Sequence, residues 1–347
     1  MGEPDANWPQ ARTPLRDRYS DSGVSIDSAT DAVERYREIA ATWRHPSQLE
    51  GIGAFAGAFR LPGDNRRALV ASTDGVGTKT LIAAALRRYR TVGADLVNHC
   101  VNDILVLNAT PLFFLDYLAV GKLDPAIAAE IVSGIHDACR AHETALLGGE
   151  TAEMPGLYRP DHFDLAGTIV GIVDVDAIPD PERVRPGDAI VGLPARGLHT
   201  NGYSLARATI PEEDWARYGD ALLAEHPSYY RAVRAIGDVA DVKAMAHITG
   251  GGLSDNVPRT LPAACKAIFE QSRWEVPPFI ADLVRTAGLS HDERYRTLNM
   301  GIGFTLVVST ADAVKALRAV PEAKVIGWIE MREAGEPAVV IHPVRTA

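Results

Sequence analysis

The sequence predicts a mixed fold of the α/β or α+β class, divided into two domains. Apolar runs typical of strands alternate with amphipathic stretches typical of helices in both halves of the chain. A length of 347 residues suits two domains of ordinary size. Prolines cluster within 178–187, which indicates a boundary there. We therefore expect a disordered leader over 1–18, an N-terminal domain over 19–177 and a C-terminal domain over 178–347.

Capping residues and apolar periodicity define the elements of the N-terminal half. Asp27 or Ser28 can cap a first helix, and Asp124 can cap a later one that has Pro125 at its first position. Ile127, Ile131, Ile135 and Cys139 form the stripe that this later helix is expected to bury. The apolar runs predict strands over 67–72, 113–120, 145–147 and 165–175, and helices over 81–86 and 94–109.

The C-terminal half shows the same mixture of patterns. Its apolar runs predict strands over 189–193, 303–308 and 325–329, and helices over 204–209 and 311–319. The charged stretch over 291–297 is expected to be a surface loop. Periodicity does not define the order of the strands in a sheet.

Composition narrows the choice of partners and compartment. Asp and Glu total 45 against 35 for Lys and Arg, so the formal net charge is -10. A nucleic-acid partner is not expected, because its phosphates require a basic surface. No run of about 18 apolar residues occurs, so no membrane partner is expected either. The three cysteines lie far apart in the chain, which is typical of a reducing, cytoplasmic location without disulfides or zinc sites.

The most informative segment, residues 72–79, lies between a predicted strand and a predicted helix. It contains Asp74, Gly75, Gly77, Thr78 and Lys79. Such a turn presents backbone N–H groups and the positive end of a helix, which suit a phosphate. Asp74 could hold a metal ion, and Lys79 could reach a phosphate oxygen. A plain tight turn is the alternative, because the spacing matches neither of the common nucleotide-binding glycine motifs.

The predicted helix over 94–109 carries a row of polar side chains. Asp95, His99 and Asn102 fall within a narrow arc at about 100° per residue, with Asp103 at its edge. Each such group would cost roughly 1–3 kcal/mol if it were buried without a partner. Two interpretations stay open: a hydrogen-bonded network in the core, and a row of ligands that faces a cation.

Three further segments combine glycine with polar side chains. Residues 148–153 offer hard oxygen ligands that suit Mg²⁺, with a solvated acidic loop as the alternative. His199 and Asn201 lie in a polar turn, where His199 could exchange protons near neutral pH or have no such role. Three successive glycines leave N–H groups open to an anion, or form a flexible connection: Gly250, Gly251 and Gly252.

Taken together, these segments resemble the aminoimidazole ribonucleotide synthetases, also called phosphoribosylformylglycinamidine cyclo-ligases. The resemblance extends from about residue 19 to about residue 327. It rests on STDGVGTK, DLVNHCVNDI, PLFFLDY, GKLD, GGETAEMPG, LHTNGYSL, HITGGG and NMGIG in the expected order. At single positions the sequence differs from the residue that is usual in this family, such as Leu198 in place of Pro and Thr200 in place of Ser. None of these departures removes a proposed charge or glycine.

The resemblance implies a homodimer with a two-domain ATP-binding fold, in which N-terminal strands of two subunits form a barrel-like junction. The implied reaction is the ATP-dependent cyclisation of formylglycinamidine ribonucleotide to aminoimidazole ribonucleotide in purine biosynthesis. In this reaction ATP phosphorylates the formyl amide oxygen, the substrate's amine nitrogen attacks the same carbon, and phosphate departs.

The resemblance also implies roles for the matching residues. The implied ligands of Mg²⁺ are Asp74, Asp103 and Glu150, with Asp95 as a further candidate. The implied nucleotide contacts are Asp74, Gly75, Gly77, Thr78, Lys79, Asp95 and Gly149, with Gly250, Gly251 and Gly252 for an anionic group such as the ribose phosphate. The implied catalytic residues are His199, Asn201 and Lys79, with His199 as a candidate proton carrier.

Three other classes of protein are alternatives. One is an ATP-using relative, either a thiamine monophosphate kinase or a selenophosphate synthetase. The latter usually needs a reactive Cys or selenocysteine near the N-terminus, and no Cys precedes Cys100. A non-catalytic nucleotide-binding paralogue predicts the loss of a metal-binding acid or of the lysine, and all of them are present. A structural protein does not explain four separate polar, glycine-rich turns.

Overall fold

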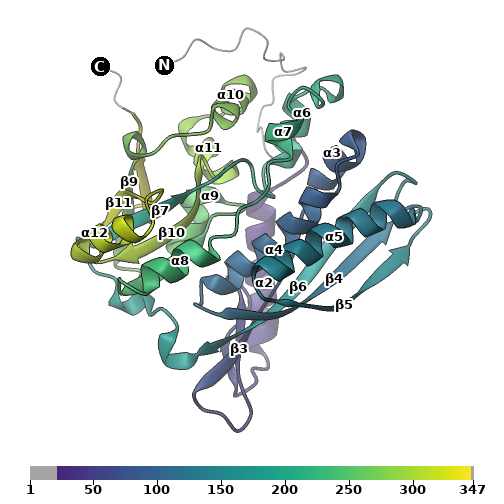
Figure 1. The fold of residues 1–347 in the computed structure, drawn as a ribbon. Coiled ribbons are helices and arrows are strands. Elements are labelled where there is room, and N and C mark those ends of the chain that lie inside the picture. Colours follow the sequence, from purple (N-terminus) through teal and green to yellow (C-terminus); the bar gives the residue numbers. More distant parts are fainter. Residues whose placement is uncertain (1–21, 345–347) are drawn as a thin grey trace.

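Two six-stranded sheets, each covered by helices, make up the protein (Figure 1). The structure is a computed structural model that describes residues 22–344. The arrangement confirms the predicted mixed α/β (α+β) class. The leader predicted over 1–18 lies outside the described residues. Within 22–344, no helix combines the length and the apolar character that crossing a bilayer requires.

The first sheet contains the N-terminal strands in the order β1-β2-β3-β6-β4-β5. All neighbouring pairs are antiparallel except β4 and β5, which are parallel. Helices α3, α4 and α5 lie on one face of this sheet (Figure 1). The bounds are β1 (Gln48–Glu50), β2 (Gly57–Arg60), β3 (Arg67–Gly75), β4 (Thr110–Val120), β5 (Ala145–Glu153), β6 (Phe163–Asp174), α2 (Ile26–Ala41), α3 (Lys79–Leu86), α4 (Arg90–Leu105) and α5 (Pro125–Ala141).

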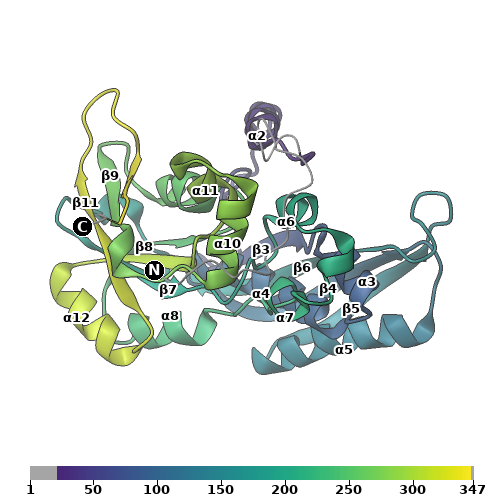
Figure 2. The same ribbon diagram turned by 90° about the horizontal axis from the view of Figure 1, so that it is seen from above.

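The second sheet contains the C-terminal strands in the order β12-β9-β11-β7-β10-β8. Only β12 and β9 run parallel. Helices α8 and α12 lie on one face, and α10 and α11 lie on the other (Figure 2). The strands are β7 (Ala189–Pro194), β8 (Val242–His247), β9 (Cys265–Glu270), β10 (Ile302–Val308), β11 (Lys324–Met331) and β12 (Val339–His342). The helices are α6 (Tyr203–Thr209), α7 (Gly219–Leu222), α8 (Tyr230–Gly237), α9 (Gly252–Asn256), α10 (Pro278–Ala287), α11 (His291–Thr297) and α12 (Thr310–Ala319).

Local capping explains several of these elements. The Oδ1 atom of Asp124 accepts hydrogen bonds from the N–H groups of Ala126 and Ile127, which confirms the predicted start of α5. Helix α2 begins two or three residues earlier than expected, because the hydroxyl of Ser25 caps it by accepting from the N–H of Ser28. The prediction of a surface loop over 291–297 is wrong. Ser290 and Glu293 form a capping box, which starts helix α11 in this charged stretch.

The N-terminal strands extend further than their apolar runs. Strand β3 continues to Gly75, and β5 continues to Glu153 through the glycine-rich acidic segment. Pairing with β6 and β4, respectively, supplies the backbone hydrogen bonds that keep these polar residues extended. The predicted site residues Asp74 and Glu150 therefore lie on strands.

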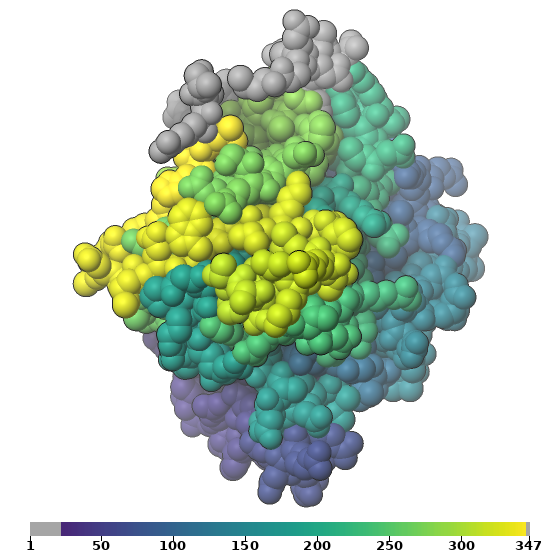
Figure 3. Space-filling view, turned by 60° about the vertical axis from the view of Figure 1, so that its left-hand side comes forward, coloured from purple at the N-terminus to yellow at the C-terminus, as the bar shows by residue number. Residues whose placement is uncertain are grey.

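One apolar core joins the two sheets. It includes Val70, Leu96 and Phe114 of the first half and Ile190 and Phe269 of the second. Figure 3 shows the C-terminal half, in green to yellow, lying against the purple-to-blue N-terminal half along an extended boundary. Helix α4 is buried along nearly its whole length, so its polar residues face partners inside this boundary.

Candidate active site at the junction of the two sheets

The segment predicted to bind phosphate lies where β3 ends and α3 begins. Asp74 and Gly75 are the last residues of the strand, and Thr78 directly precedes the helix. Gly77 has a φ of +58°, a left-handed conformation that favours glycine. The carboxylate of Asp74 and the first N–H groups of α3 therefore belong to one turn, an arrangement that suits a cation together with an anion.

Asp74 is held by His99 of α4. The Nε2 atom of His99 lies 2.6 Å from Oδ2 of Asp74, and its Nδ1 atom lies 2.7 Å from Oγ1 of Thr200. The side chain of His99 is buried, whereas 41% of the Asp74 side chain is exposed. Asp74 is thus the point at which a buried polar network reaches solvent.

Charge pairing sets the protonation states of Asp74 and His99. Burial lowers the pKa of His99, but the carboxylates of Asp74 and Asp103 outweigh it and raise the pKa to about 9. Desolvation raises the pKa of Asp74. The charge and the hydrogen bond of His99 outweigh this effect, together with the hydrogen bond from the N–H of Gly75, so the pKa lies below its ordinary value. At neutral pH the pair is therefore a carboxylate and an imidazolium.

The raised pKa of His99 predicts a pH dependence of stability. The pKa is about 9 in the folded state against an ordinary value of 6.5. His99 therefore stabilises the fold fully below pH 6.5, and this contribution is lost as the pH rises through 9. The difference in free energy of unfolding between the wild type and a His99→Gln variant should shrink by a few kcal/mol across that window. Urea denaturation at a series of pH values measures it, and a difference that stays constant would contradict the assignment.

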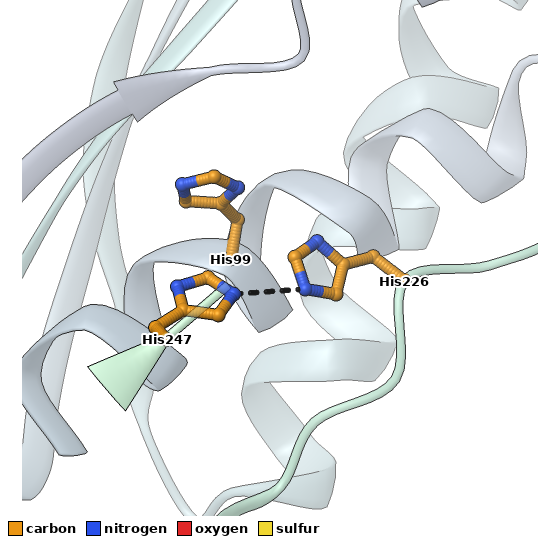
Figure 4. Close-up of side chains that lie close together, drawn as sticks. All are labelled: His99, His226 and His247. Atoms are coloured by element: carbon orange, nitrogen blue, oxygen red, sulfur yellow. Dashed lines mark hydrogen bonds between the residues drawn. The ribbon is translucent and has the colours of Figure 1, made fainter. Parts of the chain in front are cut away.

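A second network runs from Asp103 through two histidines. Asp103 Oδ2 accepts a hydrogen bond from Oγ of Ser72 at 2.9 Å, and its Oδ1 lies 2.9 Å from Nδ1 of His247. The Nε2 atom of His247 lies 3.1 Å from Nε2 of His226 (Figure 4). Burial lowers the pKa of both imidazoles, so both rings are neutral at pH 7.

The structure brings Asp74 and Asp103 together, but it does not bring Glu150 to them within one chain. One ligand atom each from Asp74, His99 and Asp103 lies within 4.8 Å of the others. Glu150 is exposed on β5, and β6 and β4 separate that strand from β3. Since neighbouring strands lie about 4.8 Å apart, Glu150 is roughly 14 Å from Asp74 across the sheet. Gly149 lies beside it on β5, opposite Asp116.

Lys79 and Asp95 form an ion pair inside the protein. The Nζ atom of Lys79 lies 2.5 Å from Oδ2 of Asp95, and neither side chain is exposed. Nζ also donates to the carbonyls of His199 at 3.2 Å and Ala224 at 2.8 Å, which occupies all three N–H groups of an ammonium. Burial raises the pKa of Asp95 to about 6, against the opposing effect of Lys79. These contacts favour a positioning role for Lys79, and its contact with phosphate stays a prediction.

His199 lies over the histidine network. Its ring stacks on that of His226, with 4.1 Å between the centroids and 14° between the planes. Its φ of +65° is uncommon for a residue other than glycine. Neither ring nitrogen has a hydrogen-bond partner within 22–344, and burial lowers the pKa of His199 well below its usual value. A neutral imidazole with a free nitrogen can accept a proton from a substrate.

The glycine segment at the start of α9 lies beside the loop that carries Asn201. A Cβ atom on Gly250 would be 3.2 Å from Oδ1 of Asn201. Gly251 and Gly252 have φ values of +96° and +57°, which other residues rarely adopt. Asn256 donates to the carbonyls of Gly250 and Gly252, so the segment is a fixed turn and not a flexible connection.

Sequence reasoning missed His226. This residue lies between α7 and α8, in a segment without glycines or an apolar period that would mark it. Its partners come from elements far away in the chain, namely Asn102 on α4 and His247 on β8. Only the packing of the two halves reveals this contact. The order of the motifs along the chain does not indicate that His226 belongs to the site.

Two family models match the two halves of the chain. Residues 53–173 match the family model described as AIR synthase related protein, N-terminal domain, and residues 185–340 match the corresponding C-terminal domain. The chain belongs to the AIR synthase family. A relative from this family, the phosphoribosylformylglycinamidine cyclo-ligase of Coxiella burnetii, is 43% identical over 338 residues. The match covers 94% of this chain and 96% of the relative.

Solved structures show the same AIR synthase type of fold. AaThiL complexed with AMPPCP and TMP superposes with a TM-score of 0.59 at 15% identity, covering 91% of this chain and 93% of that one. The hydrogenase maturation protein HypE in complex with ATP has a TM-score of 0.59 at 20% identity, covering 95% and 94%. At such identities the likeness concerns the fold alone. The predicted family and fold class are confirmed.

Proposed function

We propose that this chain is a ligase that converts formylglycinamidine ribonucleotide to aminoimidazole ribonucleotide, with release of ADP and phosphate, in de novo purine biosynthesis. The observation that carries the proposal is the 43% identity to a cyclo-ligase over 94% of the chain. The junction supports it, because acids for a cation occur there together with an imidazole that has no hydrogen-bond partner among residues 22–344.

The chemistry requires a leaving group on the formyl carbon of the substrate. Transfer of the γ-phosphoryl group of ATP to the formyl amide oxygen forms a new P–O bond and releases ADP. The amine nitrogen of the substrate then attacks the carbon, its proton is removed, and the C–O bond to the phosphate breaks. Phosphoryl transfer of this kind depends on positioning and charge neutralisation more than on a protein nucleophile.

Asp74 and Asp103 are the proposed protein ligands of Mg²⁺. Magnesium usually takes one or two carboxylates and completes its shell with water and substrate phosphate. The partial exposure of Asp74 fits this pattern, whereas Asp95 is fully buried against Lys79. Bound there, Mg²⁺ would neutralise charge on the phosphates. Glu150 lies on an edge strand, so its proposed metal role requires a second subunit.

The remaining residues are assigned to the nucleotide and to the substrate. Gly75, Gly77 and Thr78 would contact phosphates through the turn before α3, with Gly149 on β5 as a further contact. His199 would take the proton that the attacking amine releases, since its ring is neutral and has no partner within 22–344. Asn201 would face the substrate amide. The neighbouring turn would hold the ribose phosphate through Gly250, Gly251 and Gly252.

We also propose a homodimer that forms through the first sheet. Strand β5 is an edge strand, so its outer N–H and C=O groups have no neighbouring strand in the part of the chain that the structure describes. Large apolar side chains are exposed on β5 and on β4 beside it, with Leu147 at 63%, Tyr117 at 38% and Leu115 at 37%. An exposed apolar patch beside an open edge favours pairing with another chain. The predicted barrel-like junction would form there.

A Leu147→Arg variant should be a monomer at concentrations where the wild type is a dimer. The new charge would have to be buried in the subunit contact, which costs several kcal/mol. Light scattering after gel filtration measures the mass of each variant. Val314→Arg is the matched control, because Val314 is 53% exposed on α12 and lies far from this edge. A Leu147→Arg protein that stays dimeric would rule out this surface.

The division into domains and the location are part of the same proposal. The chain leaves the first sheet after Asp174 and enters the second at Ala189, which supports a division near residue 178. The three cysteines are buried and free, which supports a cytoplasmic location.

The test is to mix the pure protein with ATP, Mg²⁺ and formylglycinamidine ribonucleotide. Aminoimidazole ribonucleotide should form with one ADP for each ring closed. ADP formation with a phosphorylated product and no ring closure would instead indicate a kinase. No turnover of ATP or substrate by the folded protein would contradict the proposal.

A further inference from the structure

We propose that the junction also binds a divalent transition-metal ion through the imidazoles of His226, His247 and His99. One potential ligand atom from each ring lies within 4.8 Å of the other two, and all three side chains are buried. Figure 4 shows the rings of His226 and His247 meeting nitrogen to nitrogen, with His99 beside them. The three residues come from different parts of the chain, so such an ion would link the two halves.

The spacing of His226 and His247 suits two ligands of one ion. Their Nε2 atoms lie 3.1 Å apart. Two nitrogens that each lie about 2.0–2.1 Å from a zinc ion in tetrahedral geometry are separated by roughly 3.3 Å. A small movement of either ring therefore gives the distance that the ion requires.

Asp103 prepares His247 for this role. Its carboxylate lies 2.9 Å from Nδ1 of His247 and can only accept a hydrogen bond, so Nδ1 carries a proton and Nε2 is the ring nitrogen left for a metal ion. In many metal sites a carboxylate accepts a hydrogen bond from the outer ring nitrogen of a metal-binding histidine. This contact orients the ring and increases its basicity. The Nε2 atom of His247 faces His226.

Two nitrogen atoms from different residues approach Nε2 of His226. They are Nε2 of His247 at 3.1 Å and the amide nitrogen of Asn102 at 3.3 Å. Two backbone contacts hold Asn102 with its NH₂ group toward this ring. If Nε2 of His226 carried a proton, that proton would face the amide hydrogen of Asn102. If it carried a lone pair and His247 were protonated on Nδ1 alone, two lone pairs would face each other. A cation between the two rings would accept both lone pairs.

The ligand chemistry separates this ion from the Mg²⁺ of the proposed reaction. Imidazole nitrogens suit zinc, cobalt and nickel, whereas magnesium prefers oxygen. His99 would give up its contact with Asp74 or Thr200, and one of its two ring protons would pass to solvent as the ion binds, because a metal-bound imidazole must have a lone pair.

The experiment uses the full-length protein, stripped with EDTA and free of ATP and substrate, so its outcome is independent of the cyclisation assay. Co²⁺ is titrated while the visible spectrum is recorded, and isothermal titration calorimetry follows Zn²⁺. We expect one ion for each chain and a visible band that Zn²⁺ abolishes. His226→Gln and His247→Gln variants should each weaken binding by at least about 10-fold.

His136→Gln is the matched control, because His136 has a side chain that is 62% exposed on α5 and should leave binding unchanged. Circular dichroism checks that each variant is folded. A wild type that gives no visible band and no heat of binding would overturn the proposal whatever the variants do. Folded His226→Gln and His247→Gln proteins that bind as tightly as the wild type would also overturn it.

Discussion

A change of Asp74 to asparagine should lower the turnover of the cyclisation by about 100-fold or more, equivalent to ~2.7 kcal/mol in the barrier. Asp74 is the partly exposed carboxylate at the end of β3, where it faces both the proposed Mg²⁺ and His99. Its replacement removes a negative charge from the cation while nearly preserving the shape of the side chain. Steady-state ADP release at increasing Mg²⁺ concentrations measures the effect.

Asp161→Asn is the matched control, because Asp161 has a side chain that is 81% exposed and should tolerate the same change. Thermal unfolding of both variants separates a loss of catalysis from a loss of structure. An Asp74→Asn protein with wild-type turnover and an unchanged Mg²⁺ requirement would contradict the assignment of Asp74.

A change of Lys79 to methionine should lower the free energy of unfolding by about 3–5 kcal/mol. The loss follows because Asp95 would have no cation beside it inside the protein, and two carbonyls would lose a donor. The midpoint of urea denaturation measures the effect. Lys315→Met is the control, because the Lys315 side chain is 57% exposed on α12 and pairs only at the surface.

A double variant, Lys79→Met with Asp95→Leu, should recover most of the lost stability, because it removes both charges together. The same proteins distinguish the two roles of Lys79. A Lys79→Met protein of normal stability whose KM for ATP is strongly raised would favour direct contact with phosphate over the positioning role.

The sequence predicts the elements best where local chemistry decides them. Asp124 and Pro125 define the start of α5 without help from the rest of the fold. The polar ends of β3 and β5 are different, because pairing with neighbouring strands keeps residues such as Asp74 and Glu150 extended. The charged stretch that forms α11 lacks an apolar stripe, so its capping box is the only local signal for a helix.

The sequence predicts the candidate site in parts. The polar row on α4 faces partners inside the junction. Of its two interpretations, the hydrogen-bonded core network applies to one residue and the ligand that faces a cation applies to another. Asp95 belongs to a buried network, whereas Asp103 lies within reach of a cation shared with Asp74. The burial of Lys79 and the contacts of His226 depend on the packing of two distant segments, which no motif spacing encodes.

The most direct test of the proposed reaction follows one oxygen atom. Formylglycinamidine ribonucleotide labelled with ¹⁸O in its formyl group is converted by the protein with ATP and Mg²⁺, and the released phosphate is analysed by mass spectrometry. If ATP phosphorylates that oxygen before the ring closes, the phosphate should carry the label in each turnover. Unlabelled phosphate formed together with aminoimidazole ribonucleotide would contradict the account.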